Sequence, residues 1–380
     1  MKFDFMKPWL PILIAVISLM TVRSDAQDIH WTLFEYASLN SNPAQTGAFY
    51  GTYRIGGIVR DSEFGSQNNQ GGVTNVYGPA FTITVDGPII RGFRKQDWVG
   101  VGAAFYTDGA GDGDLSTSLS HISAAYHLAL DKKQRTVLTF GLQGGMGSRR
   151  FRAYDNLRLQ DGGIALNSTP LSQEVFNNAN VEMDNNGERI LKNDGGIDVN
   201  FGVLLKTKPN KNTSVEFGLV GKHLYPYRYG FDRDTLSGNT GGNINQNRNN
   251  AFKLGANIGL QFGMDYRFNK EWSIRPAAQF QIISGAKPYF QLGAMMGYKL
   301  DPKKDMILKF GPGYRVGDAA QLMLGFEKGP IRAGASYDMN LGDLTNVSPL
   351  YGGGVEIAVS YIGTIFKQPD LKPVIICPRY

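Results

Sequence analysis

Few residues of this chain have the type and spacing for metal or acid–base chemistry. His121 and His127 share one face of an expected strand. Six residues of strand place them roughly 20 Å apart, too far to bind one metal ion together. The segment 108–114 (DGAGDGD) has the composition of a calcium loop, but it lacks the ligand spacing and final glutamate of an EF-hand. A hairpin loop rich in aspartate and glycine explains it equally well, so calcium stays open as the lesser alternative.

Sequence motifs of known catalysts are absent. No nucleophile-elbow serine, phosphate-binding glycine loop or zinc-protease motif occurs in the 380 residues. The one cysteine, Cys377, excludes an intramolecular disulfide and a cysteine-based metal site. We therefore expect no enzyme activity, no catalytic residue, no bound metal and no cofactor. The net charge of +6 is modest and comes without a run of basic residues, so nucleic acid is not an expected partner.

The composition excludes both a helical membrane protein and a disordered chain. Hydrophobic residues make up 42% of the chain, enough to bury a large apolar surface. The one long apolar run lies at 9–20, behind two lysines. It predicts a signal peptide over residues 1–26, cleaved after Ala26, where small residues suit a signal peptidase. An uncleaved anchor helix is the alternative, but the run is shorter than the ~20 residues that span a membrane.

Hydrophobic residues alternate with polar residues or glycines along most of the remaining chain. In 251–267 every second residue from Phe252 to Tyr266 is apolar, and those between are polar, charged or glycine. Neighbouring side chains of a strand point to opposite faces, so such a strand has one apolar face and one polar face. We count about fourteen strands, near 48–59, 73–85, 98–107, 117–130, 135–147, 197–206, 213–222, 251–267, 272–282, 289–300, 305–315, 320–327, 330–339 and 353–366.

This pattern favours an all-β fold, a closed antiparallel transmembrane β-barrel of about 14 strands. Lipid cannot hydrogen-bond a free sheet edge, so strands cross it only as a closed barrel with the apolar face outward. Tight turns such as 209–211 and 269–271 alternate with long connections such as 148–196 and 223–250. We expect short periplasmic turns, long extracellular loops and contact with outer-membrane lipid. The alternative is a secreted pair of β-sandwiches, whose strands are shorter and whose connections need not alternate.

Two connections depart from the alternation, since 86–97 is long for a periplasmic turn and 316–319 is short for an outer loop.

The inward face carries charges of both signs, which predicts cross-strand ion pairs in a wet interior. These positions are Glu216, Lys253, Asp265, Arg267, Lys309, Glu327, Arg332, Asp338 and Glu356. We expect the barrel over 48–366, between a periplasmic N-terminal segment at 27–47 and a periplasmic C-terminal tail at 367–380.

The chain resembles the PorP/SprF family of outer-membrane proteins at several separate motifs. The opening at 29–47 resembles the family's leucine–asparagine–proline–alanine pattern, although Ser41 interrupts it. The segments at 313–319, 335–338 and 353–357 resemble the family's last strands, and the final four residues resemble its C-terminal ending. The motif positions, whose role is unproven, are Asn42, Pro43, Ala44, Tyr337, Asp338, Cys377, Pro378 and Arg379.

The resemblance implies a non-enzymatic barrel of the type IX secretion system in the cell outer membrane. It implies assistance in the export or surface anchoring of secreted proteins such as gliding adhesins. The secretion machinery and a secreted surface protein are then partners, with the outer loops 148–196 and 223–250 as the expected docking surface. The alternative is a general outer-membrane diffusion porin, since about fourteen strands lie between filled eight-stranded barrels and open sixteen-stranded ones.

Overall fold

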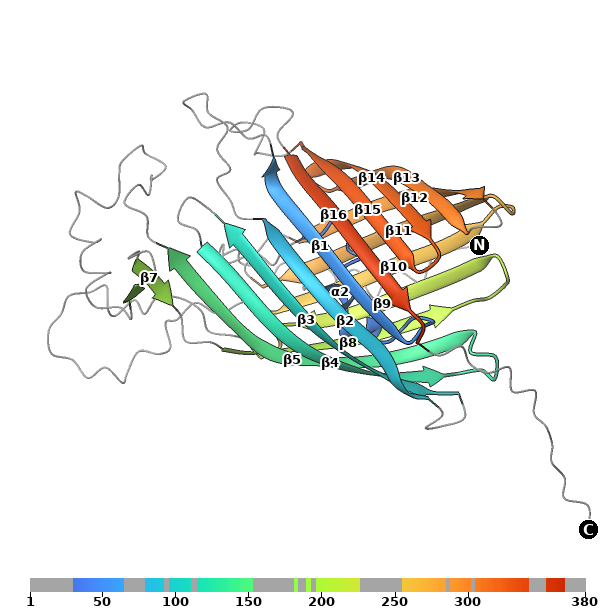
Figure 1. Cartoon of the computed structure of the whole chain (residues 1–380), viewed down its shortest axis with the longest axis horizontal. Coiled ribbons are helices and arrows are strands. Elements are labelled where there is room, and N and C mark those ends of the chain that lie inside the picture. The colour runs from blue at the N-terminus through green and yellow to red at the C-terminus, as the bar shows by residue number, and fades with distance from the viewer. Residues whose placement is uncertain are drawn as a thin grey trace, which may run out of the picture.

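Fourteen strands, all within the described part of the chain, form a closed antiparallel barrel in the computed structural model (Figure 1). They are β1 (Tyr53–Phe64), β2 (Ala80–Arg91), β3 (Trp98–Ala110), β4 (Leu115–Ala129), β5 (Thr136–Arg152), β8 (Gly196–Thr207), β9 (Thr213–Lys222), β10 (Asn257–Arg267), β11 (Trp272–Ile283), β12 (Tyr289–Asp301), β13 (Met306–Arg315), β14 (Ala319–Lys328), β15 (Ile331–Asn340) and β16 (Gly353–Gly363). Each pairs with the next of the fourteen, and β1 pairs with β16, so the ring is closed. The predicted fold is confirmed.

The structure describes the strands and part of their connections. The described residues are 30–64, 79–91, 96–110, 115–152, 181–183, 189–192, 196–225, 255–284, 288–301, 305–341 and 353–365. The expected signal peptide at 1–26 and the tail at 367–380 therefore lie outside them. Among the described residues, no helix has the length and apolar character that spanning a membrane requires.

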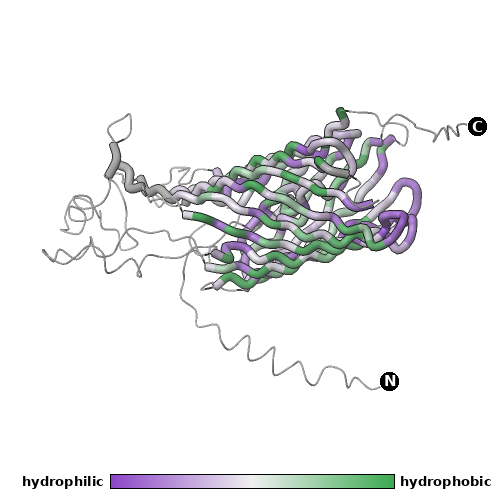
Figure 2. Tube along the Cα trace, turned by 90° about the horizontal axis from the view of Figure 1, so that it is seen from below, coloured by the Kyte–Doolittle hydropathy of each residue, from purple (hydrophilic) through white to green (hydrophobic). Residues whose placement is uncertain are grey.

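Apolar side chains cover the outside of the barrel, and hydrophobic residues recur along every strand (Figure 2). In β10, Ile258 and Leu260 are 54% and 52% exposed, whereas Gln261 beside them is buried. In β16, Ile357 is 60% exposed and its neighbour Glu356 is completely buried. Since neighbouring residues of a strand face opposite ways, the two parities form an apolar exterior and a polar interior. The predicted alternation is confirmed.

Tight turns join the strands at one end of the barrel, which we call the turn end, and the longer connections leave from the loop end. In the turn after β4, the Asp131 carboxylate accepts the backbone N–H groups of Thr136 and Lys133 at 2.7 and 3.1 Å. These bonds to the charged form hold the pKa of Asp131 below its ordinary value. Asn210 and Asn269 accept backbone N–H groups two residues on in the same way. Short polar side chains thus favour sharp reversals here.

Two details differ from the sequence prediction, and one unusual connection is as expected. Strand β2 continues to Arg91, so the connection to β3 is 92–97 and no longer breaks the alternation. The connection 316–318 is as short as expected, and Gly317 adopts a φ of +74° there. Inside the expected loop 148–196, β5 continues to Arg152 and pairs with β7 (Arg189–Lys192), which pairs with β6 (Val181–Met183). Strands of three and four residues are too short for alternation to reveal them.

The N-terminal segment from His30 to Thr46 runs through the inside of the barrel, and we call it the plug. It contains α2 (Ser38–Ser41), drawn inside the ring in Figure 1, and the short 3-10 helix η1 (Pro43–Gln45). Its apolar side chains form a core with inward-facing wall residues; the core consists of Trp31, Leu33, Phe34, Ala37, Ile58, Ala80, Tyr106, Leu119, Met295, Met323 and Ala358. The periplasmic segment expected at 27–47 is thus inside the barrel from residue 30 on, because its aromatic and aliphatic residues bury their surface there.

Candidate functional site

Inward-facing glycines allow the plug to lie directly against the barrel wall. A Cβ atom at Gly141 would stand 2.3 Å from the Ala44 backbone nitrogen, and one at Gly202 would stand 2.0 Å from the Asn42 side-chain oxygen. A Cβ at Gly100 would stand 2.3 Å from the Thr46 carbonyl oxygen. All three distances are shorter than the contacts that real Cβ atoms make. The glycines that alternate with apolar residues along β3, β5 and β8 therefore form a surface complementary to the plug.

The motif Asn42–Pro43–Ala44 fixes the plug to this surface. The Asn42 side chain is fully buried, and its Oδ1 atom accepts the Ala44 backbone N–H at 2.9 Å, which caps η1. Its Nδ2 group donates to the carbonyl oxygens of Val203 on β8 and Leu219 on β9, at 3.4 and 3.3 Å. One side-chain amide therefore forms hydrogen bonds with a backbone N–H of the plug and with two backbone carbonyls of the wall. Asn42 and Ala44 of the predicted motif are thus structural contacts between the plug and the wall.

We expect Asn42→Ala to destabilise the folded barrel by about 1–3 kcal/mol, because it removes a helix cap and two hydrogen bonds to the wall. Chemical unfolding of the purified protein in detergent measures this. Asn210→Ala is the matched control, since Asn210 also accepts a backbone N–H two residues on, at 2.9 Å, but in an exposed turn. Equal losses from both substitutions would show that Asn42 contributes only its local turn.

Four buried charged side chains hold the start of the plug at the loop end, and we call them the latch: Arg60, Arg315, Asp338 and Glu356. The Glu356 carboxylate accepts the backbone N–H groups of Thr32 and Leu33 at 2.7 and 2.8 Å. It also accepts a hydrogen bond from Arg60 at 2.5 Å. Thus one carboxylate on the last strand binds two backbone amides of the plug and one guanidinium of the first strand.

Asp338 completes the latch through the Thr32 hydroxyl. That hydroxyl donates to the Asp338 carboxylate at 2.8 Å and accepts from Arg315 at 2.9 Å. Arg315 and Arg60 also pair with Asp338, at 2.7 and 3.1 Å. Two cations thus balance two carboxylates, and the four side chains are at most 9% exposed. Buried charges are tolerated only when paired and hydrogen-bonded, so the latch depends on all its members.

The other end of the plug is held near the turn end. His127 contacts the Thr46 carbonyl oxygen at 2.8 Å through Nε2, and its ring stacks on Trp98 with centroids 4.4 Å apart. The Trp98 indole donates to the Gly47 carbonyl at 3.0 Å, and Asp86 accepts the Gly47 N–H at 2.7 Å. The plug is therefore anchored at both ends of its path through the barrel.

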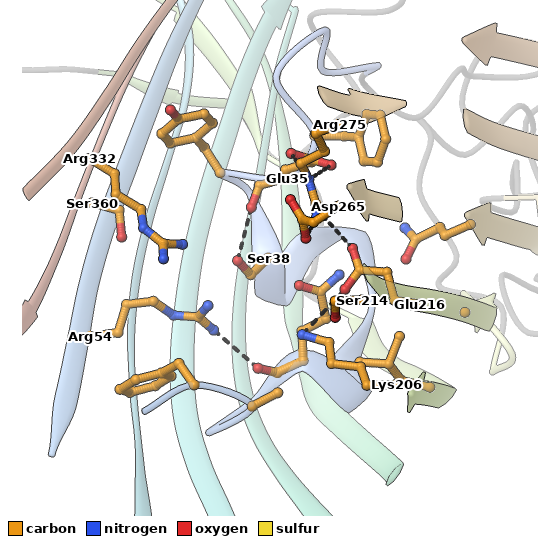
Figure 3. Close-up of a pocket in the computed structure, with 18 of the residues that line it drawn as sticks. Glu35, Ser38, Arg54, Lys206, Ser214, Glu216, Asp265, Arg275, Arg332 and Ser360 are labelled. Atoms are coloured by element: carbon orange, nitrogen blue, oxygen red, sulfur yellow. Dashed lines mark hydrogen bonds and ion pairs between the residues drawn. The ribbon is translucent and has the colours of Figure 1, made fainter. Parts of the chain in front are cut away.

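A cavity of about 450 Å³ remains between the plug and the wall, and we call it the vestibule (Figure 3). Its lining includes Tyr50, which is 88% exposed, and residues of β8 to β16 that lie toward the turn end. We infer that the cavity opens at the turn end. Charged side chains dominate its walls, and most are paired. Arg275 donates to Glu35 of the plug at 2.7 Å and to Glu216 at 2.5 Å.

Seven of the predicted inward-facing charges form ion pairs, as expected, whereas Arg267 at the turn end of β10 is exposed. Lys309 and Glu327 lie 2.8 Å apart, and Arg332 lies 3.6 Å from Glu327. Arg275 pairs with Glu216 and Asp265, while Asp338 and Glu356 belong to the latch. Lys253, Cys377, Pro378 and Arg379 lie outside the described residues, as do residues 111–114 of the calcium-like loop.

The two predicted histidines contact different groups. His121 lies 2.6 Å from Asp198, which also contacts His223 at 2.9 Å, whereas His127 contacts the plug. Within the described ranges, no group of three His, Cys, Asp or Glu residues is placed to hold a metal ion.

The sequence did not predict that residues 30–46 run through the lumen. It also gave no role to Thr32 or Arg60. A signal for the plug was present in the sequence, because inward-facing strand positions are unusually often glycine, as if another segment had to approach them closely.

Known proteins share features of this chain at low sequence identity. The Ralstonia pickettii toluene transporter TbuX is 11% identical, with 86% of this chain and 92% of that chain covered and a TM-score of 0.48. The P. putida toluene transporter TodX is 12% identical, with coverages of 87% and 94% and a TM-score of 0.48. A comparison with curated proteins gives no match. The family model described as "Type IX secretion system membrane protein PorP/SprF" matches residues 23–361.

Proposed function

Because this chain belongs to the PorP/SprF family of type IX secretion system membrane proteins, we propose that it assists the export or surface anchoring of secreted proteins such as gliding adhesins. The protein is an outer-membrane β-barrel of that system. In the proposed role it binds other proteins at the membrane and does not conduct solutes. The turn end then faces the periplasm and the loop end faces the outside, as in bacterial barrels with short periplasmic turns.

The plug is the observation that carries this proposal. A diffusion pore needs a continuous aqueous path, but here the latch and the apolar core of the plug occupy the interior. The vestibule lies toward the turn end, and Phe34, Tyr36 and Ser38 of the plug form part of its lining. A barrel filled by its own chain still offers protein surfaces at its two ends, which suits a component that docks other proteins. The general diffusion porin is the less supported alternative.

Two measurements together test the proposed function. We expect the purified protein in a planar bilayer to show no steady open-pore conductance, because the plug is latched. We expect deletion of the gene in its host to abolish surface display of a secreted partner, and the unaltered gene to restore it. Steady conductance of the purified protein, with normal display in the deletion strain, would instead identify a porin.

The expected docking loops at 148–196 and 223–250 lie mostly outside the described residues, and they remain part of the proposal. Deleting residues 160–190 should leave a folded barrel that shows a heat-dependent shift on gels. The same deletion should lose the secreted partner from the cell surface. Unchanged surface display would remove this loop from the proposed mechanism and leave the barrel's role to the gene deletion.

A further inference from the structure

The vestibule separates positive from negative charge across an accessible space. On one wall, Arg275 lies among the carboxylates of Glu35, Glu216 and Asp265, and Lys206 lies 3.3 Å from Glu216. Three carboxylates there face two cations, which leaves an excess of one negative charge. This wall consists of the plug and strands β8 to β11.

The facing wall carries the opposite excess. Lys309 and Arg332 share one carboxylate, that of Glu327, at 2.8 and 3.6 Å. Figure 3 shows Arg332 and Asp265 on opposite sides of the cavity. Both side chains are 53% exposed, so a ligand can reach them. A ligand that fits between these two oppositely charged walls carries a positive group and a negative group a short distance apart.

The rest of the barrel interior indicates that such a ligand is a polypeptide. Wall side chains already hold the plug by donating to its main-chain carbonyls: Gln291 to Thr32 at 3.0 Å, and Gln261 to Ser41 at 3.0 Å. Arg54 donates to the Gln45 carbonyl at 3.1 Å. The interior therefore binds main-chain carbonyls of a polypeptide through side-chain donors, and the vestibule is a part of the interior that the plug leaves empty.

Gln261, which lines the vestibule, also indicates that a ligand binds there. It lines the cavity and is only 8% exposed, and its Oε1 atom has no hydrogen-bond partner among the described residues. A buried acceptor in that state is ordinarily satisfied by a donor from water or a ligand. A volume of about 450 Å³ lies within the usual ~300–1,000 Å³ of ligand sites.

We propose that the vestibule binds a short polypeptide segment of a partner protein, which enters from the turn end. A basic side chain of that segment lies against Asp265 and Glu216, and an acidic side chain lies against Arg332 and Lys309. The plug remains in place and forms one side of the site through Glu35. The proposal goes beyond a role in secretion, and it can be tested on purified protein without any secretion measurement.

The test is a fluorescence-anisotropy titration of the detergent-purified protein with a dye-labelled hexapeptide that carries one lysine and one glutamate among glycines and serines. We expect Asp265→Asn and Arg332→Gln each to weaken binding about five-fold, as for accessible ion pairs, and salt to weaken it further. Glu271→Gln and Lys211→Gln make the same charge changes at exposed turn positions. These controls should bind as the unaltered protein does.

Three outcomes would overturn the proposal. The first is equal binding of a peptide whose lysine and glutamate are both glutamine. The second is unchanged affinity in both cavity variants. The third is displacement by free lysine and free glutamate as effective as by unlabelled peptide, which would identify a site for small zwitterions. A heat-dependent gel shift checks that every variant retains a folded barrel.

Discussion

Replacing Gly141 by valine will undock the plug and make the barrel conduct ions. The Cβ atom alone would lie 2.3 Å from the backbone nitrogen of Ala44, and backbone cannot move aside as a flexible side chain can. Overpacking of this kind costs about 1–3 kcal/mol. A penalty of that size shifts the ratio of undocked to docked plug roughly five- to 150-fold. Planar-bilayer recordings of the purified variant should therefore show openings that the unaltered protein lacks.

Gly144→Val is the matched control for this prediction. Gly144 lies three residues further along β5, faces outward, and a Cβ there meets nothing within 4 Å. The control should insert, show the heat-dependent gel shift and remain closed. If Gly141→Val does not fold, the smaller Gly141→Ala provides the same collision with less bulk. Folded but closed Gly141 variants would show that the plug can shift without leaving the lumen.

Removing the carboxylate of Glu356 will destabilise the barrel by about 3–5 kcal/mol, the usual cost of breaking a buried ion pair from one side. Glu356→Ala leaves the N–H groups of Thr32 and Leu33 without their acceptor and takes the nearest carboxylate from Arg60. Chemical unfolding in detergent measures the loss. The start of the plug should also loosen, and bilayer recordings should show brief openings.

Two comparisons show whether the latch acts as a unit. Asp305→Ala also removes a carboxylate from a cation, Lys299 at 2.8 Å, but in a turn where the Asp305 side chain is 77% exposed. It should cost less than about 1 kcal/mol. Adding Arg60→Ala to Glu356→Ala should cost less than the sum of the single losses, because the second change removes the uncompensated charge. Strict additivity would mean that the two side chains act independently.

The strands were predictable because alternation is a local property. Whether Ile258 faces lipid and Gln261 faces inward depends on counting positions along one strand, and the structure agrees. Strand ends were less accurate where local patterns stop. The strand expected to begin at 48 begins at Tyr53, because residues 47–52 connect the plug to the barrel wall. The short strands β6 and β7 could not be seen, since neither is long enough to alternate.

The site was predictable only in pieces. Asn42 and Asp338 were recognised as family motif positions. Nothing in the neighbouring sequence indicated that Asn42 of the plug contacts the wall or that Asp338 of the wall contacts the plug. Arg315 and Glu356 also stood within motifs, without a role. Thr32, which all four latch side chains contact directly or through a backbone N–H, had no signal at all.

Alternation along each segment was enough to predict a closed barrel with an apolar exterior, because the side-chain period of a strand is a local property. That the plug fills the interior could be learned only from the folded chain. Thr32 and Glu356 are separated by 324 positions, and Asn42 and Leu219 by 177. Such contacts depend on the completed ring bringing distant inward faces around one segment, and no local pattern encodes which partners meet there.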